Sequence, residues 1–193
     1  MTTTLRDRAY ELMTAWTPSA SLRRHMLAVE TAVAAYANHL GEDVDLWAAT
    51  GLLHDFDYER HPDLGPDGHP WVGVRYLREQ GWPEPLCEAI LGHADFTGVP
   101  RESPLAKTLY ACDEVTGLIT AAVLVRPDKD IAQQTVKSLK KKFKDKAFAK
   151  GVNRDEVEAG AADLGVDLWE HATFVLGAMQ ARAAVLGLDG RDA

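Results

Sequence analysis

Two adjacent residues of this sequence, His54 and Asp55, have side chains that commonly bind metal ions. They close an apolar stretch with helical periodicity. Neighbouring residues on a helix lie about 100° apart, so these side chains converge only near a helix end or a bend. Imidazole and carboxylate groups both bind first-row divalent metals. Because a histidine next to an aspartate is common by chance, the pair alone is a weak indication of a metal site.

Further candidate ligands fall on apolar faces or at the ends of other predicted helices; they are His25, His69, His93 and Asp113. Each histidine also has an ordinary explanation: a hydrogen-bonded core residue, a helix start, or a cation at a helix C-terminus. Asp113 is harder to explain, because a carboxylate within an apolar helix needs a counter-charge or a metal. Four histidines and two aspartates exceed the needs of one tetrahedral site. They predict two metals bridged by a carboxylate and a water.

Helical periodicity runs through nearly the whole chain, and no hairpin signal interrupts it. We therefore predict an all-α fold, a helical bundle that forms a single domain over residues 1–193. The metal-site core is expected at about 20–120, with C-terminal helices at 127–187 packing on it. Helices are predicted at about 4–16, 19–40 (or 21–40), 43–55 (or 45–55), 69–80, 84–93, 104–125, 129–143, 153–164 and 168–186. Asp43 or Asp45 is the predicted cap of the third helix, and Ser103 is that of the sixth.

The composition narrows the classes of function. The 193 residues carry a net charge of −8, which argues against general attraction to nucleic acid polymers or anionic membranes. We see no apolar signal core and no run of about 18 apolar residues. The two cysteines, Cys87 and Cys112, form no CxxC motif, which fits a reducing compartment. The expected location is the cytoplasm.

The order His25, His54-Asp55, Asp113 resembles the HD superfamily of metal-dependent phosphohydrolases, whose members are all-helical. The segments 69–77 (HPWVGVRYL) and 89–98 (AILGHADFTG) are similar to the two extra histidine regions of its two-metal branch. This resemblance implies six metal ligands with Asp55 as the bridge: His25, His54, Asp55, His69, His93 and Asp113. Tyr58 stands where many members have a lysine, and the Gly-Tyr-Pro signature of the cyclic-dinucleotide phosphodiesterases is absent from the sequence.

The resemblance implies a phosphohydrolase that uses two divalent metals, iron or manganese, to generate a bridging hydroxide, with Asp55 and His54 as catalytic residues. A nucleotide or another small phosphoester is the expected substrate. Two alternatives stay open: a di-iron oxygenase of the same ligand type, and a non-catalytic binding module stabilised by metal. A small phosphorylated substrate is the expected partner, and a homodimer is possible.

Two predicted loops, 57–68 and 94–101, flank the candidate ligands and are expected to line the site. Their candidate substrate-binding or supporting residues are Asp57, Tyr58, Asp95 and Arg101. Lysines of the amphipathic segment 137–150 could fold over the site and bind an anionic substrate; they are Lys137, Lys140, Lys144 and Lys150. A solvated helix face is the simpler interpretation of that segment. The remaining histidines, His39, His61 and His171, are expected at the surface.

Overall fold

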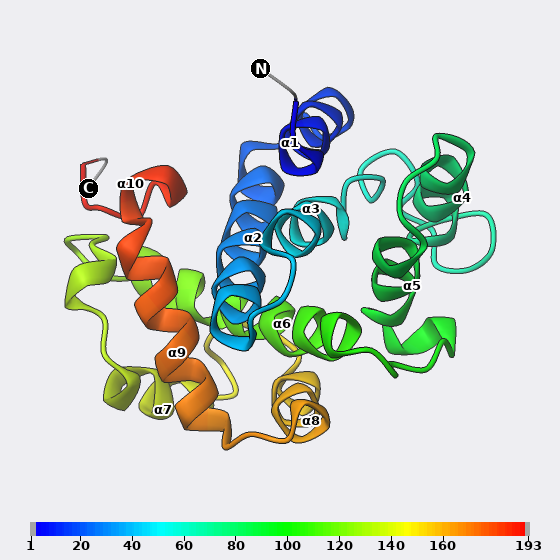
Figure 1. Ribbon diagram of the computed structural model, residues 1–193. Coiled ribbons are helices and arrows are strands. Elements are labelled where there is room, and N and C mark those ends of the chain that lie inside the picture. Colours follow the sequence, from blue (N-terminus) through cyan, green and yellow to red (C-terminus); the bar gives the residue numbers. More distant parts are fainter. Residues whose placement is uncertain (1–2, 192–193) are drawn as a thin grey trace. The chain divides into compact units, whose positions relative to one another are not determined.

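The computed structural model describes residues 3–191, and within them the regular elements are helices (Figure 1). Residue pairing of the β type is limited, in this part of the chain, to two isolated bridges. The predicted all-α fold is confirmed. No helix in the described range is long and apolar enough to cross a membrane. The chain divides into two compact units, one ending at Tyr110 and the other beginning at Ala111. A single domain over the whole chain stays a prediction.

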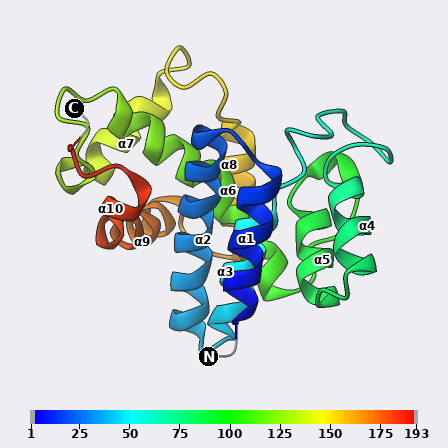
Figure 2. The same ribbon diagram turned by 90° about the horizontal axis from the view of Figure 1, so that it is seen from above.

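The first unit is built around α3, which packs against α1, α2 and α5, while α4 and α5 pair with each other (Figures 1 and 2). Its elements are α1 (Leu5–Trp16), α2 (Ala20–Leu40), α3 (Val44–Leu53), α4 (Trp71–Glu79), α5 (Glu84–Gly92), the 3-10 turn η1 (Asp95–Thr97) and the first residues of α6 (Pro104–Leu124).

Acidic side chains fix the start of α3 and tie it to α1. The Asp43 carboxylate accepts hydrogen bonds from the backbone N–H groups of Asp45 and Leu46, so it caps α3 as the sequence predicts. Asp45 in turn accepts from the backbone N–H groups of Leu5 and Arg6, at 2.8 and 3.1 Å. One helix start thus satisfies the unpaired donors of another.

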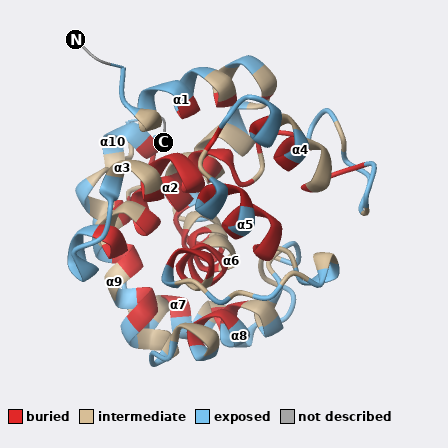
Figure 3. Ribbon diagram, turned by 45° about the vertical axis from the view of Figure 1, so that its right-hand side comes forward, coloured by how far each residue is buried: buried red, intermediate tan, exposed pale blue. Residues whose placement is uncertain are grey.

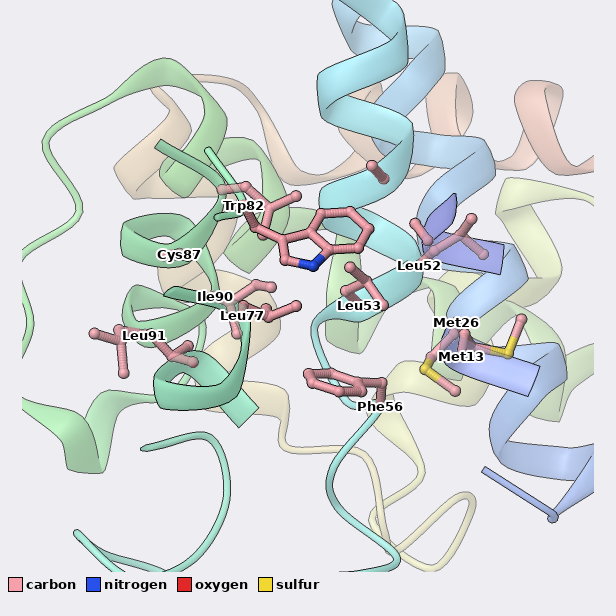
Figure 4. Close-up of a cluster of buried hydrophobic side chains, with 14 residues drawn as sticks. Met13, Met26, Leu52, Leu53, Phe56, Leu77, Trp82, Cys87, Ile90 and Leu91 are labelled. Atoms are coloured by element: carbon pink, nitrogen blue, oxygen red, sulfur yellow. The ribbon is translucent and has the colours of Figure 1, made fainter. Parts of the chain in front are cut away.

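A shared apolar core holds these helices in register. Figure 4 shows Leu53 and Phe56 between Met13 and Met26 on one side and Leu77 on the other. All five side chains are fully buried, and buried residues gather along α2 and α5 (Figure 3). Burial of a Leu, Met or Phe side chain stabilises a fold by about 1.5–3 kcal/mol. The apolar run that ends at Leu53 is therefore anchored on several sides.

The second unit is organised around α9 (Leu168–Ala181), which contacts α7, α8, α10 and the 3-10 turn η2. Leu118, Phe143 and Val157 form its apolar cluster, and the Phe143 and Trp169 rings meet edge to face with centroids 5.5 Å apart. The other elements are η2 (Ile131–Gln133), α7 (Val136–Lys144), α8 (Arg154–Leu164) and α10 (Ala183–Leu186).

Two helix predictions in this unit are wrong in their extent. The helix predicted at 129–143 begins only at Val136, because the Thr135 backbone is extended and its hydroxyl caps the N–H of Ser138. The helix predicted at 168–186 is interrupted at Arg182. Beyond that point the Leu188 carbonyl accepts a hydrogen bond from the N–H of Ile131, at 2.8 Å. Such a contact between distant segments leaves no mark in hydrophobic periodicity.

Candidate metal centre

The His54-Asp55 pair lies where the sequence predicts it, at the end of a helix. His54 is the C-cap residue of α3, and Asp55 begins the turn that follows. The fully buried Phe56 ring anchors this turn, and the Thr17 hydroxyl donates to the Phe56 carbonyl at 3.2 Å. Asp55 is therefore held at a fixed place, although it lies outside the helix.

The Asp55 carboxylate stands between two pairs of histidines. Its Oδ2 atom lies 3.7 Å from His25 Nε2 and 3.3 Å from His54 Nε2. Its Oδ1 atom lies 3.3 Å from His69 Nε2 and 3.5 Å from His93 Nε2. Two groups of possible ligands result, and within each group the ligand atoms lie within 4.8 Å of one another. One group is His25, His54 and Asp55; the other is Asp55, His69 and His93. Five of the six predicted ligands are thus brought together.

In three of these histidines the ring nitrogen Nδ1, which is not the one nearest Asp55, donates a hydrogen bond to a protein acceptor. His54 Nδ1 donates to the Gly51 carbonyl at 2.8 Å, and His93 Nδ1 donates to the Ile90 carbonyl. His69 Nδ1 donates to Asp57 Oδ1 at 2.8 Å. A neutral imidazole that donates through Nδ1 has its lone pair on Nε2. In all three rings that nitrogen faces Asp55.

The donor set fits a metal. His54 is fully buried and the side chains of His69 and His93 are nearly so, whereas Asp55 and His25 are partly exposed. Burial raises the pKa of the Asp55 carboxyl, but His54 and His93 in their protonated form outweigh it through charge and hydrogen bonding and hold the pKa well below its ordinary value. A bound metal ion would supply that positive charge while the rings stay neutral. His54 Nε2 also lies only 3.2 Å from His25 Nε2. A carboxylate facing convergent ring nitrogens is an arrangement that a divalent cation satisfies.

A family model described as "HD domain" matches residues 22–118, slightly more than half of the chain. The chain belongs to the HD domain family. The match confirms the predicted superfamily and its all-α fold, and it covers every histidine and aspartate of the candidate centre. HD domain proteins are mostly metal-dependent hydrolases, and the two histidine–aspartate groups could hold a metal. Searches of curated proteins and of solved structures found no match.

In this HD domain the predicted loop residues lie close to the candidate ligands. The Tyr58 ring stands edge-on to His69 at 5.3 Å. Arg101 donates to the carbonyl of Gly92, which precedes His93, and to Asp95 Oδ1, at 3.0 and 2.9 Å. Substrate binding by Tyr58, Asp95 and Arg101 stays a prediction. Asp57, in contrast, is buried with both oxygens occupied by protein donors, which favours a supporting role over substrate contact.

The other predicted site residues belong to the second unit. Asp113 lies on α6 just beyond the boundary at Tyr110, and its role as a sixth ligand stays a prediction. The same holds for substrate binding by the lysines of this unit. Lys137, Lys140 and Lys144 lie on α7, and Lys150 lies between α7 and α8.

The expected surface position of His171 is wrong. Its side chain is buried, and Nε2 donates to the Ala111 carbonyl at 2.8 Å. Burial lowers the pKa of this imidazole, and the hydrogen bond to Ala111 opposes that shift. His39 is exposed and His61 is half-buried.

Three backbone groups that serve the centre were not predicted from the sequence: the carbonyls of Gly51 and Ile90, and the N–H of Gly73. A signal for the two carbonyls exists. His54 and His93 each directly follow an apolar helix, whose last carbonyls have no partner within the helix. A histidine at that position has an acceptor three residues before it.

Proposed function

We propose that this protein is a metal-dependent phosphohydrolase that acts on a nucleotide or another small phosphoester at a centre of two divalent metal ions. The observation that carries the proposal is the placement of Asp55, whose two oxygens each face a separate pair of histidines. A carboxylate so placed is suited to bridging two ions. The resemblance of the ligand set to the two-metal branch supports the same assignment.

Each residue of the centre has a distinct part in this proposal. His25 and His54 would hold one ion through Nε2, and His69 and His93 would hold the other. When bound, the ions would acidify a water molecule and neutralise charge on the phosphoryl oxygens. The Nδ1 hydrogen bonds of His54 and His93 keep both rings in one orientation. The side chains of Asp55 and His25 are partly exposed, so substrate would approach the centre from their side.

Arg101 is a candidate cation of the first unit for holding a phosphate group. Its guanidinium stacks on the Tyr110 ring at 3.6 Å and is fixed by Asp95 and the Gly92 carbonyl next to His93. A guanidinium can bind phosphate through two parallel hydrogen bonds. Lysines of the 137–150 segment are further candidates for this role.

The experiment compares phosphate release by three proteins: the wild type, Asp55→Ala and Asp67→Ala. Each is first loaded with Fe²⁺ or Mn²⁺ in the absence of oxygen. Asp67 is a fully exposed aspartate of the neighbouring loop and serves as the matched control. The substrates are a panel of nucleotides and aryl phosphoesters. We expect hydrolysis by the wild type and the control, and none by Asp55→Ala. Hydrolysis by Asp55→Ala, or none by the wild type with either metal, would contradict the proposal.

A di-iron oxygenase is the second candidate. Each group contains two imidazoles and one carboxylate, the ligand set that also supports oxygen activation by non-haem iron. Oxygen uptake by the Fe²⁺-loaded protein with an organic phosphonate or a polyol, combined with no phosphate release from phosphoesters, would favour it. A metal-stabilised binding module is the third possibility, and it predicts neither reaction.

A further inference from the structure

Asp57 is a buried carboxylate with two different donors. It lies in the turn after the His54-Asp55 pair and is 1% exposed. Oδ1 accepts a hydrogen bond from His69 Nδ1 at 2.8 Å, and Oδ2 accepts one from the backbone N–H of Gly73 at 2.7 Å. Each oxygen therefore serves one donor, and the carboxylate joins His69 to the first turn of α4.

The need for this carboxylate follows from the position of His69 along the chain. His54 and His93 follow helices, and carbonyls in the last turn of those helices hold their Nδ1 atoms. His69 precedes α4 instead, and a helix N-terminus offers only unpaired N–H donors. An N–H group cannot accept a hydrogen bond from His69 Nδ1–H. The Asp57 carboxylate fills this role, because it accepts from both His69 and the N-terminus of α4.

Gly73 is the residue that lets this acceptor fit. A Cβ atom at this position would lie 2.6 Å from Asp57 Cγ and 2.9 Å from the Phe56 ring. Both atoms are buried and cannot move away cheaply. The close approach of α4 to Asp57 thus requires glycine, independently of any contact that Asp57 makes with His69.

We propose that Asp57 is a positioning residue that keeps His69 in the Nδ1–H form, so that the Nε2 lone pair faces Asp55 and a metal held by Asp55, His69 and His93. In the neutral ring the shorter contact favours Nδ1–H, because Nδ1 lies 2.8 Å from Asp57 Oδ1 whereas Nε2 lies 3.3 Å from Asp55 Oδ1. Only the use of Nε2 as a ligand rests on the proposed function.

Asparagine at position 57 gives a sharp test, because its side chain has the same shape as aspartate but carries an NH₂ donor in place of one oxygen acceptor. The Gly73 N–H can only donate, so the amide oxygen of the variant must face it. The amide NH₂ group then faces His69 Nδ1 and requires a lone pair there. His69 would change to the Nε2–H form, and metal binding through Nε2 would first require that proton to move.

The first measurement is the tautomer of His69 in metal-free protein, read from long-range ¹H–¹⁵N NMR of the imidazole rings, with the signal assigned by a His69→Gln variant. We expect Nδ1–H in the wild type, Nε2–H in Asp57→Asn, and no change in the exposed control Asp67→Asn. An Nε2–H ring in the wild type, or an unchanged ring in Asp57→Asn, would overturn the proposal. If Asp57→Asn does not fold, the wild-type tautomer decides alone.

The second measurement is titration of the same proteins with Co²⁺. Loss of an outer-shell partner lowers metal affinity by about 10- to 100-fold. We expect that loss in Asp57→Asn for one of two bound equivalents, and wild-type affinity for both in Asp67→Asn. Wild-type affinity for both equivalents in Asp57→Asn would refute the positioning role. The NMR result holds even if no phosphoester is hydrolysed, so failure of the proposed function is recognised separately.

Discussion

Asp55 differs from the other residues of the centre because it belongs to both ligand groups. His25 contributes to one group and His93 to the other, whereas the two oxygens of Asp55 contribute to each. Substitutions should therefore have unequal effects. We expect His25→Ala to retain one metal per chain and Asp55→Ala to retain none, because Asp55 is the negatively charged ligand that both groups share.

Metal content after gel filtration, measured by elemental analysis, checks this prediction. His39→Ala is the control, since that histidine is exposed, and it should keep the wild-type metal content. Equal metal content in the Asp55→Ala and His25→Ala variants would show that Asp55 is not shared.

The sequence predicts which residues meet better than it predicts how each is held. Five predicted ligands converge, because helix ends and apolar faces are visible in the order of residue types. The sequence predicts a substrate-binding or supporting role for Asp57, but its actual contacts include the Gly73 amide sixteen residues away. Such a hydrogen bond depends on tertiary packing, which no local pattern encodes. The roles of Asp113 and the lysines stay predictions.

Helix ends carry much of the site's geometry. The C-termini of α3 and α5 supply the carbonyls that orient His54 and His93, and the N-terminus of α4 supplies the amide that holds Asp57. A shift of α3 would therefore move His54 and Asp55 with it. That position depends on a close approach to α2, because a Cβ atom on Gly51 would lie 2.7 Å from the Glu30 Cα.

Gly51→Ala should destabilise the fold by about 1–3 kcal/mol, the usual cost of forcing extra atoms into a packed contact. The contact is with backbone, which cannot rotate away. Gly177→Ala on α9 is the matched control, because a Cβ atom there meets nothing within 4 Å. It should be neutral or stabilising by up to about 1 kcal/mol. Urea unfolding of both variants tests this, and equal effects would contradict it.

Most helices could be predicted from periodicity and capping residues, including the Asp43 cap of α3 and the Ser103 cap of α6, whose hydroxyl accepts from the N–H of Ala106. The start of α7 and the interruption after Ala181 could not. The extended Thr135 backbone and its hydroxyl cap fix the start of α7. The segments before α7 and after α10 are joined by a hydrogen bond between Ile131 and Leu188, which no local pattern shows.

At the scale of the whole molecule, His171 should make stability depend on pH. Burial lowers its pKa from the ordinary value of 6.5, so the unfolded chain binds a proton at higher pH than the folded protein does. The stability gained from the neutral imidazole is complete above about pH 6.5 and is lost as pH falls from there toward the lowered pKa.

Urea unfolding of the wild type and His171→Gln at several pH values between about 5 and 8 isolates this contribution from those of the other histidines. Glutamine can still donate to the Ala111 carbonyl but does not titrate. The wild type should lose more stability than the variant on acidification. Parallel pH profiles would show that His171 does not contribute.

The most direct test of the proposed two-metal centre is the ratio of metal to protein in freshly purified wild-type protein, measured by elemental analysis without added chelator. The placement of Asp55 between two histidine pairs predicts two iron or manganese ions per chain. One ion or none per chain, unchanged after loading with Fe²⁺ or Mn²⁺ in the absence of oxygen, would contradict it.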